Sequence, residues 1–350
     1  MATYKDDSIL YLCREDVERA CREIDCVAVL REVFRMHGSG QTILPDEAYL
    51  TWTNEKGESV RSLNMPSYVA GSLRIAGTKI INSNICNPGR GLPRASGLTL
   101  LYDDTSVRVV CVMEGAYLSS LRTASVTALT VDLLKGAYVQ CAAIIGAGVL
   151  ARAHIDLLVR RLAQLRQIKI FDVDRERITA LQSDLAPVLQ AHDVTLEATS
   201  TAEEAIRSAQ LVVPATTTTV GYIRFDWLQP GSLLVNVSLD DPLPEVVLKA
   251  DVVIVDDWGL VRNDQRRLIG RMYREGQIIG PDELVEAANN GRRQIDAQLG
   301  EIVMGTKIGR RKANDVILVN PFGLSIEDMV LAAHVYQTAR VLGIGARLER

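Results

Sequence analysis

Residues 142–172 read AAIIGAGVLARAHIDLLVRRLAQLRQIKIFD. An apolar run leads into the turn Gly146-Ala147-Gly148, an amphipathic stretch follows, and a second apolar run ends in Asp172. This order of strand, GxGxxA turn, helix and strand is typical of the first βαβ unit of a Rossmann dinucleotide-binding domain. The pattern therefore predicts a dinucleotide whose pyrophosphate lies at the N-terminus of the helix.

Each position of the turn has a physical role. Gly146 permits the tight turn, Gly148 lets the backbone approach the pyrophosphate, and Ala151 is small enough for the helix to lie against the strand. The exposed N–H groups and the positive end of the helix attract phosphates. We therefore expect Val149 and Leu150, at the start of the helix, to bind the cofactor together with the two glycines.

Asp172 lies about 20 residues beyond the motif, where Rossmann domains carry an acidic residue. Its carboxylate can accept hydrogen bonds from ribose hydroxyls and would repel a 2′-phosphate. This favours NAD as the cofactor, although Asp174 and Arg175 beside it leave NADP open as an alternative.

Composition restricts the class of protein. A chain of 350 residues with 47% hydrophobic and 23% charged residues is typical of a globular protein of two domains. The net charge of −4 gives no basis for binding nucleic acid. No apolar run approaches the roughly 20 residues that cross a membrane, and the first residues do not resemble a signal peptide. We expect a cytoplasmic protein with neither nucleic-acid nor membrane partners.

The cysteines and histidines predict no metal site. The six cysteines are scattered without a CxxC pair, and we interpret them as reduced residues of the core. The four histidines lack the spacing of metal ligands.

Secondary-structure patterns divide the chain into two parts. Helix and strand patterns typical of an α+β domain precede the fingerprint, and strands then alternate with helices, which predicts a parallel sheet with crossover helices. Helices are also expected at residues 281–289 and 326–342, the last packing back on the first domain. We therefore assign residues 1–135 and 326–350 to an α+β domain and residues 136–325 to a Rossmann domain.

Two cations stand in apolar surroundings. Arg122 lies in LSSLRTASVTAL, and burial of its guanidinium is costly unless an anion meets it. That anion is either a substrate carboxylate, which arginine can bind in bidentate geometry, or an acid of the same domain. Lys79 lies inside the strand pattern RIAGTKIIN, where it faces either a site or solvent at an exposed edge.

Two further segments are candidates for binding or catalysis. The loop at residues 83–97 carries Arg90 and Arg94 among glycines and prolines, which suits anion recognition, a lid or a solvated surface loop. Asp240 and Asp241 follow a predicted strand at the edge where open α/β sheets bind ligands. Asp241 is therefore a candidate base, or a turn or helix-cap residue before Pro242. At the same edge we expect cofactor contacts from Ala215, Thr216, Thr217, Val237 and Ser238.

Together these segments resemble the ornithine cyclodeaminase/μ-crystallin family over nearly the whole chain. The matching pieces are Asn64-Met65-Pro66, GTKIIN with Lys79, LRTAS with Arg122, IIGAGVLARAH, VNVSLDD with Asp241, and GRRKANDVILVNPFGLSIEDM at residues 309–329.

The resemblance implies a homodimer formed through the first domain, NAD bound by the Rossmann domain, and an active site in the cleft between the domains. Lys79 and Arg122 would hold a substrate carboxylate and polarise the reacting centre. Asp241 would lie near the amino group and the attacking water. Met65 and Arg94 would complete the contacts to a small substrate derived from an amino acid.

Three segments resemble the branch of the family that makes 2,3-diaminopropionate for siderophores and antibiotics, namely NPGRGLPRASG, SLDDPLPEVVLKADVVIVDD and VNPFGLSIEDM. The resemblance implies NAD-dependent oxidative hydrolysis of N-(2-amino-2-carboxyethyl)-L-glutamate to 2-oxoglutarate and 2,3-diaminopropionate. The alternatives are an ornithine cyclodeaminase, another amino-acid dehydrogenase or imine reductase, and a catalytically silent NAD(P)H-binding protein like μ-crystallin.

Three positions depart from the family pattern. Leu63 stands where cyclodeaminases carry a glutamate, and Asp46 stands where they carry a basic residue. Both differences argue against cyclisation of ornithine. Asp240 occupies a position where the diaminopropionate branch is expected to have a basic residue, which leaves the exact substrate open.

Overall fold

The structure is a computed structural model that describes residues 8–136, 138–283 and 292–350. Most of the helix expected at residues 281–289 therefore lies outside the described residues. The chain divides into two compact units, Met1–Arg122 with Leu324–Arg350 (unit 1) and Thr123–Gly323 (unit 2). The division falls inside helix α3 (Ala116–Leu134), whereas the sequence-based assignment placed that whole helix in the first domain.

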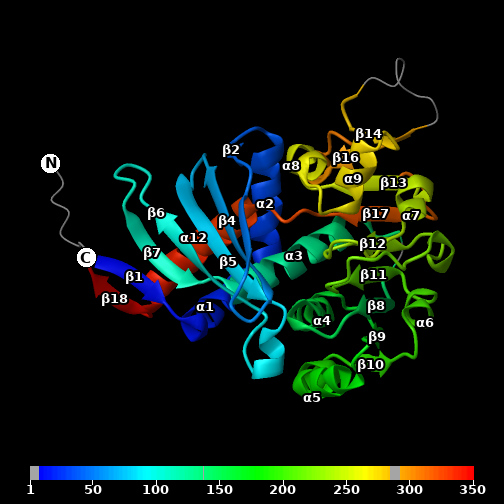
Figure 1. Ribbon diagram of the computed structural model, residues 1–350, viewed down its shortest axis with the longest axis horizontal. Helices are drawn as coiled ribbons and strands as arrows, with labels where there is room; N and C mark the ends of the chain where they lie inside the picture. The colour runs from blue at the N-terminus through cyan, green and yellow to red at the C-terminus, as the bar shows by residue number, and fades with distance from the viewer. Residues whose placement is uncertain (1–7, 137, 284–291) are drawn as a thin grey trace. The chain divides into compact units, whose positions relative to one another are not determined.

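Unit 1 contains an eight-stranded sheet in the order β18-β1-β7-β6-β5-β4-β2, with β3 paired to β4 (Figure 1). The pair β1–β7 is parallel and the other pairs are antiparallel. The elements of this unit, apart from α3, are β1 (Ser8–Leu12), α1 (Arg14–Cys21), α2 (Cys26–Gly38), β2 (Thr42–Ile43), β3 (Ala48–Thr53), β4 (Ser59–Val69), β5 (Ile75–Asn84), a 3-10 helix (Asn87–Arg90), β6 (Ala95–Tyr102), β7 (Val109–Glu114), α12 (Ser325–Leu342) and β18 (Ala346–Glu349).

Helix α12 is the central helix of unit 1. It packs against β4, β5 and β6 (Figure 1), and its first nine residues, SIEDMVLAA, are all buried. Met329 and Val335 of this helix join Leu101 and Met113 of the sheet in one apolar core. Although α12 is largely apolar, no helix in the described parts of the chain is long and apolar enough to cross a membrane.

Unit 2 contains an eight-stranded sheet in the order β10-β9-β8-β11-β12-β17-β13-β16, and all its strand pairs are parallel. If β8 is counted first, the strands from β10 to β12 follow the first five places of the Rossmann order, 3-2-1-4-5, and β17 rather than the next strand in the chain occupies the sixth place. This arrangement confirms the predicted fold class. The elements are β8 (Cys141–Ile145), α4 (Val149–Arg161), β9 (Gln167–Phe171), α5 (Arg175–Ala191), β10 (Thr195–Ala198), α6 (Ala202–Ile206), β11 (Leu211–Pro214), a 3-10 helix (Phe225–Trp227), β12 (Leu233–Val235), α7 (Pro244–Lys249), β13 (Val252–Val255), α8 (Trp258–Asn263), α9 (Leu268–Arg274), β14 (Ile278–Ile279), β15 (Arg293–Gln294), β16 (Ala297–Gln298), α11 (Leu299–Met304) and β17 (Ile317–Asn320).

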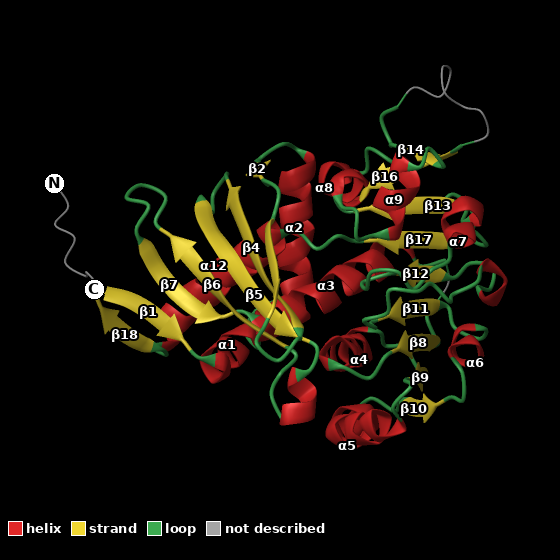
Figure 2. Cartoon of the chain, in the orientation of Figure 1, coloured by secondary structure: helices red, strands yellow, loops and turns green. Residues whose placement is uncertain are grey.

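The central strands of unit 2 are covered on both faces. Helices α4 and α5 lie on one side of the sheet, and α6 and α7 lie on the other (Figure 2). The strands LVVP (β11) and VVIV (β13) are accordingly buried at every residue, as expected for a parallel sheet with helices on both faces. Strand β17 enters the sheet between β12 and β13, although β13 precedes it in the chain.

The prediction that the cysteines belong to the core is wrong for two of them. Cys111 and Cys141 are buried, but Cys86 is exposed and Cys13 is only half-buried. Cys86 directly precedes the 3-10 helix Asn87–Arg90, where the chain turns at the surface.

His154 is a buried titratable group of the fingerprint helix α4. Its Nδ1 donates to the carbonyl oxygen of Leu150 at 2.7 Å, because a carbonyl can only accept. Its Nε2 therefore accepts from the Thr127 hydroxyl at 2.9 Å. Burial lowers the pKa of His154 to about 4, so the imidazole is neutral in the folded protein near neutral pH.

We expect His154 to weaken the fold in acid. Between its ordinary pKa and the lower folded value, the unfolded chain binds a proton that the folded chain excludes. From pH 7 to pH 4.5 the wild type should thus lose about 2–3 kcal/mol more unfolding free energy than a His154→Gln variant. Urea unfolding at both pH values measures this, and the exposed His192→Gln is the matched control. Equal losses in the wild type and His154→Gln would contradict the assignment.

Candidate functional site

The glycine turn of unit 2 has the geometry that the fingerprint requires. Gly146 directly follows β8 and has φ +100°, a conformation that favours glycine. A Cβ at Gly146 would lie 2.8 Å from the carbonyl oxygen of Ala215. The turn after β8 and the residue after β11 are therefore in close contact, which brings two predicted cofactor-binding residues together.

The N-terminus of α4 offers room for a phosphate. Gly148 is the N-cap of α4, which begins with Val149 and Leu150. A Cβ at Gly148 would meet no atom within 4 Å, so the space beside the first helical turn is open. Ala151 is fully buried, as the prediction of a small residue at this position requires. These features fit a pyrophosphate bound by the first N–H groups of the helix.

Asp172 follows β9 and is fixed at the same turn. Its Oδ2 accepts the N–H of Ala147 at 2.6 Å, and its Oδ1 accepts the N–H of Asp174 at 2.8 Å. The half-buried carboxylate is thus oriented by the backbone, as an acceptor for ribose hydroxyls must be. A fixed negative charge at this place fits NAD better than NADP.

The predicted residues at the ends of β11 and β12 surround Asp241, which is fully buried. Oδ1 of Asp241 accepts from Thr216 Oγ1 at 2.7 Å and from the Tyr222 hydroxyl at 2.8 Å, and Oδ2 accepts from Ser238 Oγ. Burial raises the pKa of Asp241, and the hydroxyl hydrogen bonds partly oppose this rise. The helix-cap alternative is excluded, because the N-cap of α7 is Leu243.

The remaining predicted cofactor contacts lie at the same strand ends. Ala215 and Thr217 flank Thr216 after β11, and Val237 precedes Ser238 after β12. Strands β11 and β12 are adjacent and parallel. Their carboxyl ends therefore meet at one edge of the sheet, where Rossmann folds bind their ligands.

The charge of Asp240, one of the departures from the family pattern, is balanced by a nearby arginine. Asp240 Oδ1 lies 2.8 Å from Arg271 Nη2 on α9. A positive charge is therefore present beside this position, although the sequence places an acid there.

Lys79 of unit 1 lies on β5 with Met65 of β4 and Thr99 of β6 as its cross-strand partners. Its side chain is only 2% exposed, which excludes the alternative of an exposed edge lysine. Its Nζ donates to Asp328 Oδ2 at 2.6 Å and to Ser119 Oγ at 3.4 Å. Burial, and then the nearby Arg122, lower the pKa of Lys79, while Asp328 acts in the opposite direction.

Arg122 meets acids of its own unit. Its Nη1 donates to Glu327 Oε2 at 2.8 Å, and its Nε lies 3.4 Å from Asp328 Oδ1. Lys79 and Arg122 thus form with Glu327 and Asp328 a buried cluster of two cations and two carboxylates, named the buried charge cluster below. A substrate carboxylate has to compete with these two acids for the cations.

Glu327 and Asp328 were not predicted as site residues from the sequence. Both lie in the otherwise apolar start of α12, SIEDMVLAA, and both are fully buried. A charge in an apolar helix needs an opposite charge nearby, as was noted for Arg122. Two acids in an apolar stretch were therefore a signal in the sequence that could have identified them. Tyr222 had no comparable signal, because its role depends on a contact across 19 residues of chain.

Arg94 lies apart from the buried charge cluster. It directly precedes Ala95, which pairs with Ser83 of β5, and Ser83 pairs in turn with Arg61 of β4. This row is separated from that of Lys79 by four residues along each strand, or about 13 Å.

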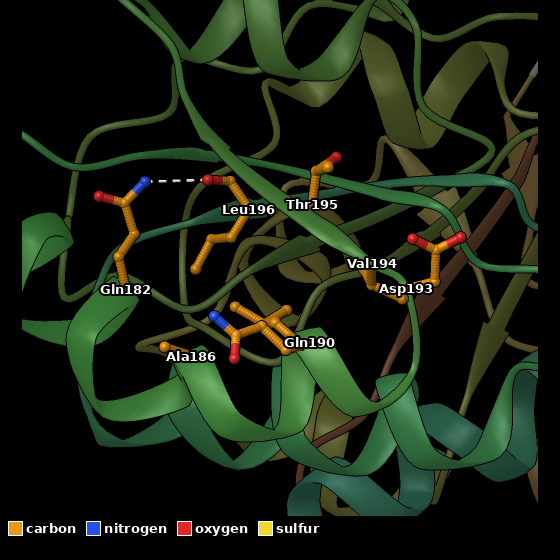
Figure 3. A pocket seen from close by; sticks show the side chains of 8 residues that line it. Gln182, Ala186, Gln190, Asp193, Val194, Thr195 and Leu196 are labelled. Atoms are coloured by element: carbon orange, nitrogen blue, oxygen red, sulfur yellow. Dashed lines mark hydrogen bonds between the residues drawn. The ribbon is translucent and has the colours of Figure 1, made fainter.

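A pocket of about 450 Å³ lies between α5 and β10 (Figure 3). Within it, the Gln182 amide donates to the carbonyl oxygen of Leu196 at 2.9 Å. None of the predicted site residues lines this pocket, and Asp193 is its one charged lining residue. It therefore lacks the cations that a carboxylate substrate requires.

Known proteins with similar sequences indicate the family of this chain. A sequence model of the ornithine cyclodeaminase/mu-crystallin family matches residues 8–342. The N-((2S)-2-amino-2-carboxyethyl)-L-glutamate dehydrogenase of Staphylococcus aureus is 31% identical over 97% of this chain and 98% of the relative.

Two solved structures are also similar. That of a protein named CmnK is 35% identical, with a TM-score of 0.88 and coverage of 98% of each chain. The Delta(1)-pyrroline-2-carboxylate reductase of Thermococcus litoralis, solved with NADH and L-proline, is 24% identical, with a TM-score of 0.85 and coverage of 97% of this chain and 100% of that chain. The predicted family, oxidoreductase class and NAD cofactor are confirmed.

The buried charge cluster predicts how unit 1 responds to substitution. Lys79→Met leaves Asp328 without its closest cation, which should cost about 3–5 kcal/mol of unfolding free energy. The double variant Lys79→Met/Asp328→Leu removes one charge of each sign and should recover most of the loss. Urea unfolding of both variants tests this, and a double variant as unstable as the single one would contradict it.

Proposed function

The chain belongs to the ornithine cyclodeaminase/mu-crystallin family, and from this premise we propose that it catalyses the NAD-dependent oxidative hydrolysis of N-(2-amino-2-carboxyethyl)-L-glutamate. The amine, NAD⁺ and water give 2-oxoglutarate, 2,3-diaminopropionate, NADH and a proton. The observation that carries the proposal is Asp241, a buried carboxylate held by hydroxyl groups at the cofactor edge of the sheet. The similarity to the Staphylococcus aureus dehydrogenase supports the choice of substrate.

NAD⁺, when bound, supplies the acceptor for the hydride on the α-carbon of the glutamyl half. Loss of that hydride leaves a positively charged iminium group, a protonated imine, between this carbon and the bridging nitrogen. Water adds to the iminium carbon and loses a proton. The nitrogen then gains a proton, and the C–N bond breaks as the new hydroxyl group loses its proton to form the carbonyl group of 2-oxoglutarate. The chain therefore has to hold the substrate, bind water and move a proton.

Asp241 is the candidate for the proton transfer. Its raised pKa brings the carboxyl closer to neutral pH, where a general base is most effective. The hydroxyls of Thr216, Tyr222 and Ser238 can both donate and accept, so a proton can reach the buried carboxylate through them. In this role Asp241 takes a proton from the attacking water and returns it to the leaving amine.

Lys79 and Arg122 are the candidates for the α-carboxylate of the substrate. Lys79 lies on β5 and Arg122 lies on α3, and both are near the carboxylate of Asp328 on α12. The two cations are therefore close together. The α-carboxylate would exchange for Asp328 or Glu327 as their partner. Met65, the cross-strand neighbour of Lys79, would pack against the substrate beside them.

The substrate-facing side of β4 argues against ornithine. Side chains of a strand alternate between its faces, so Leu63 lies on the same face as Met65 and Lys79. A glutamate at Leu63 could bind the side-chain ammonium of ornithine, whereas leucine cannot. The face therefore suits a substrate without a second ammonium at this place.

Asp241→Asn tests the proposal. The amide keeps the shape of the side chain but cannot accept a proton, so we expect NAD binding to remain while turnover falls by at least about 100-fold. Turnover is followed as NADH absorbance at 340 nm with the proposed substrate, and the exposed Asp226→Asn is the control. Full turnover by Asp241→Asn would remove it from the mechanism. A wild type active on ornithine or on other amino acids, but not on the proposed compound, would overturn the substrate assignment.

We further propose that unit 1 forms a homodimer through β3 and the adjoining outer face of its sheet. Strand β3 is exposed along its whole length, and among the described residues it pairs with β4 on one edge only. Leu50 and Trp52 are 60% and 47% exposed and point to the same face. Exposed apolar side chains on a strand with one unpaired edge are typical of an interaction surface.

The double variant Leu50→Glu/Trp52→Glu should shift the protein from dimer to monomer, because like charges would face each other at the interface. Light scattering coupled to size-exclusion chromatography measures the mass. Val341→Glu, which charges an exposed apolar position on α12 instead, is the control. A wild type that elutes as a monomer would contradict the proposal.

A further inference from the structure

Arg61 and Arg94 are cations for which the described part of the chain supplies no carboxylate partner. Neither forms an ion pair with a carboxylate among the residues that the structure describes. Arg90 in the same loop differs, because Glu58 neutralises it with two contacts. Burial, and then the charge of Arg61, lower the pKa of Arg94, so the two guanidinium groups lie within each other's electrostatic field.

The register of the sheet fixes the position of this pair. Arg61, Ser83 and Ala95 form one row across β4, β5 and β6, and Arg94 directly precedes Ala95. Arg61 Nε donates to Ser83 Oγ at 2.8 Å, and the N–H of Asn84 donates to the carbonyl oxygen of Arg94 at 2.9 Å. The backbone and one side-chain contact thus hold both arginines at the same end of the sheet.

Arg61 shares a sheet face with Lys79. Arg61, Leu63 and Met65 alternate onto one face of β4, and Met65 is the cross-strand partner of Lys79. The row between them consists of Leu63, Ile81 and Gly97, so no carboxylate separates the two groups of cations along this face. Arg61 and Leu63 are half-buried, whereas Met65 and Lys79 are buried.

The difference in charge balance decides which cations are ready for a ligand. Lys79 and Arg122 are already paired with Glu327 and Asp328, but Arg61 and Arg94 repel each other until an anion arrives. Two guanidinium groups without an acidic partner attract a carboxylate. A guanidinium group can bind a carboxylate through two parallel hydrogen bonds.

We propose that Arg61 and Arg94 form a binding subsite for a substrate carboxylate that is remote from the reacting carbon. The inference rests on the proposed function, whose substrate carries two such carboxylates in addition to the one beside the reacting carbon. The subsite would then determine substrate specificity, because an amine without a remote carboxylate leaves the two arginines without an anionic partner.

A binding experiment tests the subsite independently of turnover. Isothermal titration of the full chain with NAD⁺, at fixed ionic strength, compares glutarate with pentanoate, which has the same chain length and one carboxylate fewer. We expect the wild type to bind glutarate at least tenfold more tightly, and Arg61→Gln and Arg94→Gln to reduce this ratio to near unity. Arg90→Gln, from the same loop but already neutralised, should keep it. A ratio unchanged in both variants would overturn the proposal.

Kinetics then identify the carboxylate. For the proposed substrate, both variants should raise KM at least tenfold with little change in kcat. The two mono-amides that each lack one remote carboxylate are compared with it, and the amide whose KM no longer responds to Arg61→Gln marks the carboxylate bound. Equal responses for the substrate and both amides would overturn the subsite. Failure of the wild type to turn over the substrate would overturn the proposed function while the glutarate result still decides the subsite.

Discussion

The buried charge cluster is the constraint on which unit 1 depends. Lys79 and Arg122 sit on β5 and α3, and their carboxylate partners sit together on α12, more than 200 residues away in the chain. Burying any one of these charges alone would cost several kcal/mol. All elements must therefore assemble together, and the return of the chain from unit 2 is fixed by electrostatics as well as by the apolar face of α12.

Unit 1 consequently carries two kinds of cation. Those of the buried charge cluster are neutralised by the protein itself and contribute to holding α12 on the sheet. Arg61 and Arg94 form no ion pair among the described residues, and both lie at the half-buried end of the same sheet. Leu63, which replaces an acid expected of cyclodeaminases, is part of this arrangement, because an acid there would supply the missing counter-charge.

In unit 2 the corresponding buried charge is a single carboxylate, that of Asp241. Asp241 has hydroxyl donors on both oxygens and a pKa raised by burial. A cation in direct contact would lower the pKa of the carboxyl group and so oppose its protonation. Hydroxyl groups instead orient the carboxylate and can also transfer a proton. Of the residues that hold Asp241, Thr216 and Ser238 follow β11 and β12, beside the turn that fits the pyrophosphate, and Tyr222 lies in the segment between these strands.

The sequence by itself determined the Rossmann unit, the family and the cofactor, because these depend on local patterns such as Gly146, Gly148 and Asp172, whose roles follow from turn geometry and strand order. It also identified Lys79, Arg122 and Asp241 as charges in unusual places. Only the tertiary structure decided their partners, since a contact with Asp328 or Tyr222 depends on how distant segments pack. The sequence alone likewise did not predict the position of β17 or the proximity of Arg61 and Arg94. Strand order and register are properties of the folded sheet rather than of any single stretch of sequence.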